Sequence, residues 1–358
     1  MIPGPTPIPE SVLLELARHP IGHRSKEFSD VFMSCIEDLK WLGKTKASDV
    51  FIYTASGTGA MEAAISNVIS PGDKVLSLAI GVFGKRFAQI SEVYGAKVET
   101  MITEPGKIID VKVLEEKLSQ DKEIKVVTVT HSETSTGAAN DLEAIAKTVK
   151  SHGILLIVDA VTSLACMNVE IDKWGLDVVI SGSQKGFMLP PGLSFIYVSE
   201  KAWEYYKNSK CPKFYFDFTR QKKSLSEKTT PFTPNITFIC ALKKAFEMMK
   251  QEGLENIISR HAFLTKKLRA GLKSLSLKLL TEDKNASHAI TAIYPPEGVS
   301  VPDVRAAYKN NWDITVANGQ DTLKDKIFRI GHLGFICDRD IEMTLAVTKN
   351  IFEKLKVN

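Results

Sequence analysis

The chain has 358 residues, of which 44% are hydrophobic and 25% charged, a globular composition long enough for two domains that each bury a core. Its 46 basic and 42 acidic residues are spread along the sequence and give a net charge of +4, so no basic stripe of the kind that binds nucleic acid is present. Five scattered cysteines without a CxxC pair, a Pro-rich start and the lack of an apolar run of about 20 residues lead us to expect a soluble, cytoplasmic protein without a disulfide frame, metal site or membrane partner.

Short β-branched runs alternate with helical patterns from residue 49 onward. The predicted strands are 49–55, 74–80, 96–102, 124–131, 154–161, 176–182 and 193–199. Most are apolar on both faces, as strands covered on two sides must be. Helical patterns, several ended by glycine, lie between many of them at 58–69, 84–95 and 142–153. This alternation predicts an α/β fold with a mostly parallel seven-stranded sheet sandwiched by helices.

The pattern changes after about residue 250. A long amphipathic helix at about 252–275 is followed by the strands "HAITAIYPP" and "IFRIGHLG" and by a helix from about 338. This order predicts a smaller α+β domain beside the first. We therefore expect an N-terminal segment (1–15) that packs near the functional site, a large domain (16–250) and a small C-terminal domain (251–358).

Several residues that follow strands have the chemistry of a ligand site, because ligands collect at the carboxyl ends of parallel strands. "SGTG" (56–59) opens a helix, so its backbone N–H groups and hydroxyls predict an anion site, although an ordinary helix N-cap explains the same residues about as often. Phe83 follows the next strand, where a packing role is the simpler interpretation. Asp159 follows an apolar run, and a loop-capping carboxylate is the simpler interpretation there.

Lys185 favours a ligand site over these ordinary structural roles. Most lysines are solvated, but this one lies in "DVVISGSQKGFMLPP" (177–191), after a strand end and before Pro190 and Pro191, which prevent a regular helix. A lysine held in a partly dry pocket loses proton affinity, and its neutral amine becomes a nucleophile for carbonyls. An anion cradle, an aromatic ring, a carboxylate and an activated amine at one sheet edge describe a site for pyridoxal phosphate.

Six segments in the same order resemble the class V aminotransferases of pyridoxal-phosphate fold type I. They are "TASGTGAMEAA", "THSETSTGAANDL", "LLIVDAVTSL", "SGSQKGFMLPPGLSF", "TPFTPN" and "IFRIGHLG". The likeness is strongest to the alanine–glyoxylate, serine–pyruvate and serine–glyoxylate group, and it runs from "GPTPIPESV" to "RIGHLG". The separation of 26 positions between Asp159 and Lys185 also fits this family. The resemblance implies a transaminase with pyridoxal 5′-phosphate as its cofactor.

The resemblance assigns a role to each residue around the cofactor ring. It implies that Lys185 bonds to the cofactor aldehyde and then moves the proton between substrate Cα and cofactor C4′. It implies that Asp159 pairs with the pyridine nitrogen. Phe83 would stack on one ring face, Val161 would pack on the other, and Thr134 would bind the ring hydroxyl.

The resemblance also implies a phosphate site shared between subunits. Its phosphate-binding residues in one chain would be Ser56, Gly57, Thr58 and Gln184. In relatives a threonine of the segment matching "TPFTPN" reaches the phosphate of the neighbouring subunit, a role we assign to Thr233 with Thr230 as the second candidate. A homodimer with shared active sites is therefore expected. The sequence departs from some relatives at Thr58 and Phe83, where they have histidine and tryptophan, so weaker phosphate and stacking contacts are expected here.

The substrate-binding candidates are Arg329, Gly4, His23 and Arg24. By resemblance, Arg329 would clamp the substrate α-carboxylate through both guanidinium nitrogens, and Gly4 of "GPTPIPESV" would lie against the substrate. His23 and Arg24 belong to "HRSKEF", which resembles a stretch that meets a distal substrate anion in phosphoserine and aminoethylphosphonate aminotransferases. Alternatively, the pair braces the N-terminal segment over the cleft.

The resemblance implies transfer of an amino group from alanine or serine to glyoxylate or pyruvate by a ping-pong mechanism. Phosphoserine or 2-aminoethylphosphonate aminotransferase is the alternative. A cysteine desulfurase is less favoured, because Leu333 stands where such lyases often have a thiol and Cys337 lies further on. A non-enzymatic redox subunit is also less favoured: some relatives have carried a soluble-hydrogenase label, but the cysteine spacing offers no metal cluster.

Overall fold

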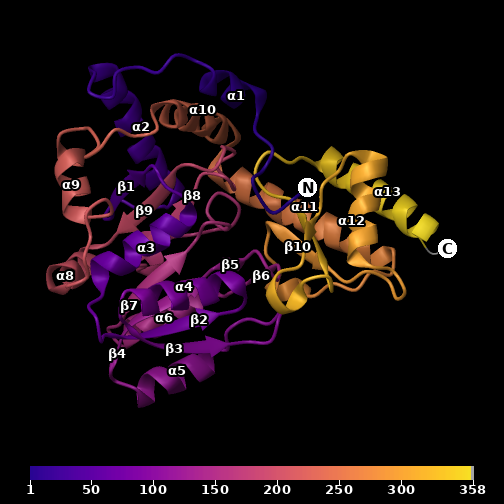
Figure 1. Ribbon diagram of the computed structural model, residues 1–358, viewed down its shortest axis with the longest axis horizontal. Helices are drawn as coiled ribbons and strands as arrows, with labels where there is room; N and C mark the ends of the chain where they lie inside the picture. Colours follow the sequence, from indigo (N-terminus) through magenta and orange to yellow (C-terminus); the bar gives the residue numbers. More distant parts are fainter. Residues whose placement is uncertain (356–358) are drawn as a thin grey trace.

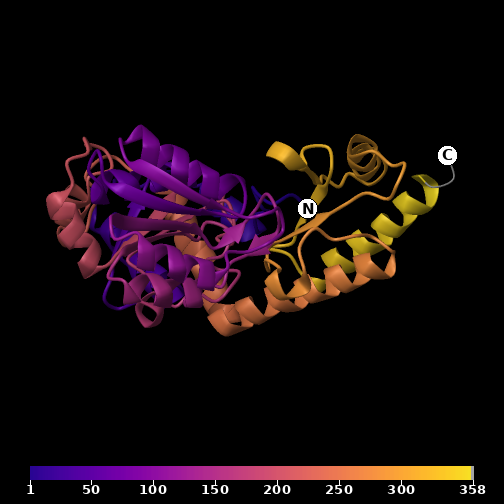
Figure 2. The same ribbon diagram turned by 90° about the horizontal axis from the view of Figure 1, so that it is seen from below.

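A computed structural model describes residues 1–355 of the chain. Figures 1 and 2 show an elongated molecule with a larger part built around a sheet and a smaller part at one end. The chain passes from one part to the other between α10 (Ile236–Glu252) and α11 (Leu254–Ser274). The expected small domain, 251–358, starts close to this point, and its last residues, 356–358, lie outside the described part.

The prediction of a mostly parallel seven-stranded sheet is confirmed. The strands are β1 (Asp49–Tyr53), β2 (Lys74–Ala79), β3 (Lys97–Ile102), β4 (Ile124–Thr130), β7 (Leu155–Asp159), β8 (Val178–Gly182) and β9 (Ser194–Val198). Their order in the sheet is β1-β9-β8-β7-β4-β2-β3. Only β9 runs against its neighbours, pairing antiparallel with both β1 and β8. The alternating helices therefore return the chain to one edge, where the carboxyl ends of the parallel strands meet.

Helices cover both faces of this sheet. In chain order the larger part has α1 (Glu10–Leu16), α2 (Lys26–Leu42), α3 (Gly57–Val68), α4 (Val82–Val93), α5 (Val111–Gln120), α6 (Leu142–Ser151), α7 (Ile171–Trp174), α8 (Glu200–Asn208), α9 (Phe218–Ser226) and α10. Strand residues alternate between the faces: Val50 and Ile52 pack in a core with α2, α5, α6 and α10, whereas Phe51 and Tyr53 pack with α3, α8 and α9. The sandwich arrangement expected from two-sided apolar strands is thus present (Figure 2).

The smaller part is built on a three-stranded antiparallel sheet. Its elements are β10 (Ile290–Ile293), β11 (Ala317–Asn318), β12 (Phe328–Gly331), α11, α12 (Val301–Trp312) and α13 (Asp338–Leu355). The sheet order is β10-β12-β11, and its apolar side chains form a separate core with the three helices. The two predicted strands correspond to β10 and β12, and α11 runs from the larger part along the smaller one (Figure 2).

A short hairpin joins the two parts near the sheet edge. It consists of β5 (Ser132–Glu133) and β6 (Ala138–Ala139) and follows directly after β4. The Ser132 and Ser287 hydroxyls lie 2.7 Å apart, and Thr281 Oγ1 donates to the Thr136 carbonyl at 3.0 Å. These buried contacts fix the smaller part against the loop that follows β4.

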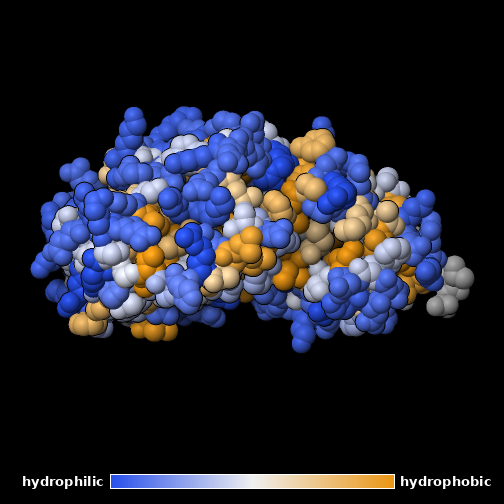
Figure 3. Space-filling view, turned by 90° about the horizontal axis from the view of Figure 1, so that it is seen from above, coloured by the Kyte–Doolittle hydropathy of each residue, from blue (hydrophilic) through white to orange (hydrophobic). Residues whose placement is uncertain are grey.

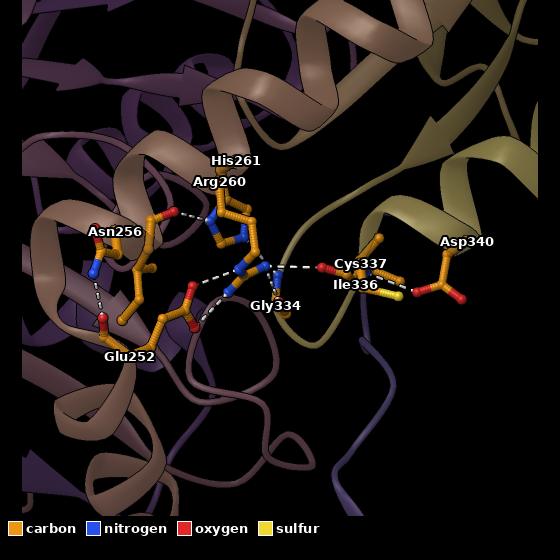
Figure 4. Close-up of polar contacts among 9 residues, drawn as sticks. Glu252, Asn256, Arg260, His261, Gly334, Ile336, Cys337 and Asp340 are labelled. Atoms are coloured by element: carbon orange, nitrogen blue, oxygen red, sulfur yellow. Dashed lines mark hydrogen bonds and ion pairs between the residues drawn. The ribbon is translucent and has the colours of Figure 1, made fainter.

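Arg260 on α11 forms a second connection between the parts (Figure 4). Its guanidinium binds both carboxylate oxygens of Glu252, at 2.5 and 3.1 Å, and donates to the carbonyls of Gly334 and Ile336 at 3.2 and 2.9 Å. The adjacent His261 accepts a hydrogen bond from Gly334 N at 3.0 Å. The end of α10 is therefore tied to the loop that follows β12.

A cavity of about 650 Å³ lies at the junction of the two parts and is lined largely by apolar side chains, including Met188, Met248 and Met343. On the face drawn in Figure 3, hydrophobic residues gather near the middle and over the adjoining region of the smaller part. None of the helices among residues 1–355 is both long and apolar enough to cross a membrane.

Because three histidines are buried, we expect the free energy of unfolding to fall in acid. Burial lowers the pKa of His131 to about 4 and those of His261 and His332 to about 3. Since the unfolded chain binds these protons near pH 6.5 and the folded chain does not, the stability present above pH 6.5 is lost as the pH falls toward 3. Each histidine accounts for about 2 kcal/mol between pH 7 and pH 5.

The His332→Gln variant isolates one of these contributions. Urea unfolding of both proteins at pH 7 and pH 5 should show a fall in unfolding free energy that is smaller by about 2 kcal/mol in the variant. Equal falls in the two proteins would mean that His332 is not the source of the pH dependence.

Candidate active site

A cavity of about 320 Å³ opens at the carboxyl edge of the large sheet. It is lined by the N-terminal segment, the start of α3, the start of α4 and the loops after β4, β7 and β8. The lining residues are Gly4, Pro5, Ser56, Gly57, Thr58, Met61, Phe83, Arg86, Thr134, Asp159, Val161, Thr162, Gln184, Lys185 and Pro191. Most of the residues singled out from the sequence therefore meet in one cavity.

Lys185 lies in the loop after β8, and its side chain is buried under the N-terminal segment. Its Nζ donates to the Pro3 carbonyl, and Thr6 Oγ1 donates to the Lys185 carbonyl at 3.0 Å. A side chain at Gly4, where φ is +140°, would come within 2.9 Å of the Lys185 side chain. Burial lowers the pKa of Lys185 to about 8, opposed by the carboxylate of Asp159. The amine is therefore covered and has a reduced proton affinity.

Asp159 is the last residue of β7 and is buried. Its Oδ1 accepts a hydrogen bond from Val161 N at 2.9 Å, and its Oδ2 accepts one from Thr130 Oγ1 at 3.4 Å. Burial raises the pKa of Asp159 to about 7, although the Val161 N–H favours the charged form. The Asp159 carboxyl group is thus held in a fixed orientation, and among residues 1–355 no ion pair is formed with it, although the charge of Lys185 favours its ionised form.

The start of α3 forms a polar end of the cavity. Ser56 is the N-cap residue, and its Oγ accepts from Gly59 N at 3.3 Å. A Cβ at Gly57 would lie 3.0 Å from Val161 Cγ2, so this position has room only for glycine without a shift of its neighbour. Gln184 Oε1 is buried and has no hydrogen-bond partner among residues 1–355. The free helix N–H groups are donors suited to an anionic ligand group, whereas the Gln184 oxygen is an acceptor, so the amide would have to turn and present its NH2 group to bind an anion.

Glu133 fixes the backbone on the aromatic side of the cavity, although no local pattern in the sequence marks it as a site residue. It is fully buried, and its Oε2 accepts from Phe83 N at 3.0 Å and Gly84 N at 3.3 Å. Its other oxygen accepts from Ser135 N and Oγ, at 3.0 and 2.6 Å. A carboxylate from the loop after β4 therefore caps α4 and fixes the backbone that carries Phe83.

Arg329 lies behind the cavity wall on β12. Its Nη1 donates to the Thr134 carbonyl at 2.9 Å and to Gln320 Oε1 at 3.1 Å, and its Nε donates to the Asn318 carbonyl at 2.8 Å. The Thr134 hydroxyl lies 2.9 Å from that of Thr162. Burial lowers the pKa of Arg329 to about 10, so its guanidinium remains charged near neutral pH and contacts the cavity through Thr134.

Besides Arg329, four of the sequence candidates lie outside the lining of this cavity in the single chain. Arg24 is exposed, and its Nη1 donates to Thr229 Oγ1 and, at 2.7 Å, to the Thr230 carbonyl. Thr230 is buried and donates to the Phe232 carbonyl, Thr233 is exposed, and His23 is half-buried. The structure therefore joins Arg24 to the threonine segment and not to Lys185.

Arg86 and Met61 line the cavity but were not selected from the sequence. The guanidinium carbon of Arg86 lies 4.6 Å from the centre of the Phe83 ring, and its Nη1 donates to Thr58 Oγ1 at 3.1 Å. Phe83 and Arg86 are one helical turn apart in "GVFGKR". This spacing is the one feature of the sequence that indicates a contact between them.

The residues fit pyridoxal 5′-phosphate. A buried amine of lowered pKa suits its aldehyde, the buried Asp159 suits its ring nitrogen, and Phe83 offers a face to the ring. The free N–H groups at the start of α3 suit the phosphate. Such an arrangement can hold an amino acid next to a base and an electron-withdrawing ring.

The chain is similar to known proteins in both sequence and structure. Residues 10–335 match the family described as Aminotransferase class-V. The chain is 51% identical to the "Soluble hydrogenase 42 kDa subunit" of Anabaena cylindrica, covering 97% of this chain and 91% of that one. It is 34% identical to serine–glyoxylate aminotransferase of Arabidopsis thaliana, covering 98% and 89%. The crystal structure of alanine–glyoxylate aminotransferase from Nostoc sp. superposes with a TM-score of 0.94 at 30% identity, covering 98% and 94%.

Proposed function

The chain belongs to the class V aminotransferases, and from this premise we propose that it moves an amino group from alanine or serine to glyoxylate or pyruvate, with pyridoxal 5′-phosphate as its cofactor. The observation that carries the proposal is the buried amine of Lys185, which lines one cavity together with Asp159, Phe83 and the start of α3. Relatives named for serine and alanine as amino donors support the choice of a small donor.

Lys185 would act as nucleophile and as proton carrier. When bound, pyridoxal 5′-phosphate supplies an aldehyde carbon that receives the amino group and a ring that stabilises negative charge at the substrate Cα. With a pKa of about 8, about a tenth of the Lys185 amine is neutral at pH 7. Its Nζ can therefore take the proton from the substrate Cα and return it on the acceptor side.

The remaining lining residues would orient the cofactor. Asp159 would hold the protonated ring nitrogen, Phe83 and Val161 would enclose the ring, and Thr134 would bind its hydroxyl. The phosphate would be held by Ser56, Gly57, Thr58 and Gln184. Support for this division comes from the fixed carboxylate at one end of the cavity and the free helix N–H groups at the other.

Arg329 would bind the substrate α-carboxylate. Its guanidinium is charged and is aimed at the cavity wall through the Thr134 carbonyl. A carboxylate offers two oxygens in the geometry that a guanidinium matches. Gly4 would lie beside the substrate, because its lack of a side chain leaves room next to Lys185.

Single-substrate half-reactions test the donor and the ping-pong order together. The holoenzyme is mixed separately with alanine, serine, aspartate, phosphoserine and 2-aminoethylphosphonate, and the visible absorption of the bound cofactor is followed. Alanine or serine should react fastest and without any 2-oxo acid present. Fastest reaction with a phosphorylated donor would favour the alternative aminotransferases, for which His23 and Arg24 would then have to approach the substrate.

We also propose that two chains assemble into a dimer with shared sites. Phe214 and Tyr215 are 64% and 39% exposed, and both stack on Phe232, next to the exposed Thr233. The neighbouring Phe216 lies close to Gly59, in the first turn of α3. An exposed aromatic group beside the phosphate end of the cavity is typical of a protein interface.

Light scattering tests the assembly. The protein is expected to have the mass of a dimer, and Phe214→Asp is expected to shift it toward monomer and to lower its affinity for the cofactor, since Thr233 would no longer reach the second site. Lys207→Asp, on the exposed side of α8, serves as the control and should remain dimeric. Full activity in a monomer would contradict the shared site.

Two other activities have distinct tests. A cysteine desulfurase needs a thiol near the amine of Lys185. Here Leu333, at the position where such lyases often have that thiol, is buried, and Cys337 lines the larger junction cavity and not the cavity of Lys185. Release of sulfide from cysteine would nevertheless support a lyase. The hydrogenase name of one relative is tested by elemental analysis; residues 1–355 contain no group of three or more His, Cys, Asp or Glu side chains placed to hold a metal ion.

We propose a cytoplasmic location for the protein. All five cysteines are free thiols, and three of them are buried, which suits a reducing compartment. Activity recovered in the cytosolic fraction of lysed cells, separated from membranes, would support this location.

A further inference from the structure

Among residues 1–355, Arg86 is the one cationic side chain besides Lys185 that lines the cavity. It lies on α4, half-buried, one turn after Phe83. Its guanidinium carbon is 4.6 Å from the Phe83 ring centre, and its Nη1 is 3.1 Å from Thr58 Oγ1. Among residues 1–355 no carboxylate forms an ion pair with it, whereas the neighbouring Lys85 pairs with Asp321 at 2.6 Å.

The contact with Thr58 places this charge at the start of α3. Thr58 belongs to the first turn of that helix, whose N-terminal N–H groups are free of intrahelical partners. Because Arg86 donates to the Thr58 oxygen, the Thr58 hydroxyl proton is left to donate elsewhere. The Phe83 ring and the Thr58 hydroxyl together restrict the guanidinium, so little side-chain freedom remains to be lost when an anion binds.

The other residues at this end of the cavity carry no charge. Ser56, Gly57, Thr58 and Gln184 can supply hydrogen bonds, but a phosphate ester carries close to two negative charges at neutral pH. An anion of this charge in a partly dry site requires a compensating cation. Within the described chain, Arg86 is the cation that touches this end.

We propose that Arg86, positioned by the Phe83 ring and the Thr58 hydroxyl, neutralises the phosphate of the bound cofactor. This inference rests on the proposed function, since it takes pyridoxal 5′-phosphate as the ligand. Arg86 would supply the positive charge at the phosphate site, because Thr58 is neutral.

Binding to the apoenzyme tests the proposal without measuring catalysis. Affinities for pyridoxal 5′-phosphate and for pyridoxal, which lacks the phosphate, are measured by quenching of protein fluorescence for the wild type, Arg86→Gln and Arg86→Lys. Arg86→Gln should weaken binding of the phosphorylated compound about 10- to 100-fold, the loss of a hydrogen bond to a charged group, and leave pyridoxal binding unchanged. Arg86→Lys should lose less, because it keeps the charge without the planar fork.

Lys85→Gln is the matched control. It removes the same charge from the adjacent residue of α4, but Lys85 lies in a different cavity, next to Asp321. It should keep wild-type affinity for both compounds, and inorganic phosphate should compete less well in Arg86→Gln than in either Lys85→Gln or the wild type. Thermal unfolding of each apoenzyme verifies that the variants are folded.

The outcomes separate the possible failures. Equal weakening of both compounds in Arg86→Gln would overturn the proposal and leave Arg86 as a support for Phe83 alone. Unchanged affinity for both would overturn it as well. A wild-type protein that binds neither compound would contradict the proposed function itself.

Discussion

Replacement of Lys185 by alanine is expected to lower the rate of transamination by at least about a thousandfold, because one residue supplies both the nucleophile and the Cα base. Steady-state rates with alanine and glyoxylate measure this loss. The backbone contacts of the loop, from Thr6 to the carbonyls of Gln184 and Lys185, do not depend on the amine. The variant should therefore fold and remain able to bind the cofactor through its phosphate.

Lys185→Arg separates the charge of this residue from its chemistry. Arginine keeps the positive charge but remains protonated, so it can act neither as nucleophile nor as base. Both variants are expected to be inactive to a similar degree, and a small added amine is expected to restore part of the activity of Lys185→Ala. A Lys185→Ala enzyme that transfers amino groups at the wild-type rate would refute the proposed mechanism.

Replacement of Asp159 by asparagine is expected to lower kcat by about 100- to 1,000-fold, the range seen when one preorganised electrostatic contact at a reacting centre is removed. The amide retains an oxygen for the Val161 N–H, so the shape of the site is largely kept. What is lost is the negative charge that would hold a proton on the ring nitrogen. The affinity for the α-carboxylate, assigned to Arg329, should change much less than kcat.

The same substitution should make the apoenzyme more stable at high pH. Burial raises the pKa of Asp159 from 3.8 to about 7, so the folded protein holds this proton more tightly than the unfolded chain. The resulting stability is complete below pH 3.8 and is lost as the pH rises through 7. In Asp159→Asn the cost of the buried charge is absent, and the gain above pH 7 is up to about 4 kcal/mol.

Urea unfolding of the apoenzymes at pH 8 and pH 4 measures this gain. The difference between Asp159→Asn and the wild type should be large at pH 8 and should shrink toward pH 4. A variant that is less stable than the wild type at pH 8 would show that the hydrogen bonds to Asp159 outweigh the cost of its burial.

The strands and the central residues of the site were accessible from the sequence for local reasons. Apolar β-branched runs identify buried strands, and the residue after each run lies at the ligand edge by topology alone. The sequence alone therefore predicts that Lys185 and Asp159 lie at the same edge of the sheet. The reversed direction of β9 was not foreseen, because strand direction depends on partners that are distant in sequence.

The site residues that the sequence does not reveal make contacts with helices or segments that are distant in the chain. Glu133 is buried because it caps α4, which begins some fifty positions earlier in the chain, and no local pattern marks such a contact. Arg86 has the composition of an ordinary solvated helix residue, and only the packing of α3 against α4 brings it to Thr58. Arg24 likewise meets a segment about two hundred positions away. Tertiary contacts of this kind cannot be derived from periodicity.

Residues 1–3 connect the strand that carries Arg329 to the loop that carries Lys185. The Met1 carbonyl accepts from Gly331 N on β12, two positions after Arg329, while the Pro3 carbonyl accepts from the Lys185 amine. The strand that carries the guanidinium and the loop that carries the amine are thus spanned by a three-residue strap. Under the proposed function, we expect any displacement of β12 on binding of a carboxylate to be transmitted through residues 1–3 to the loop that carries Lys185.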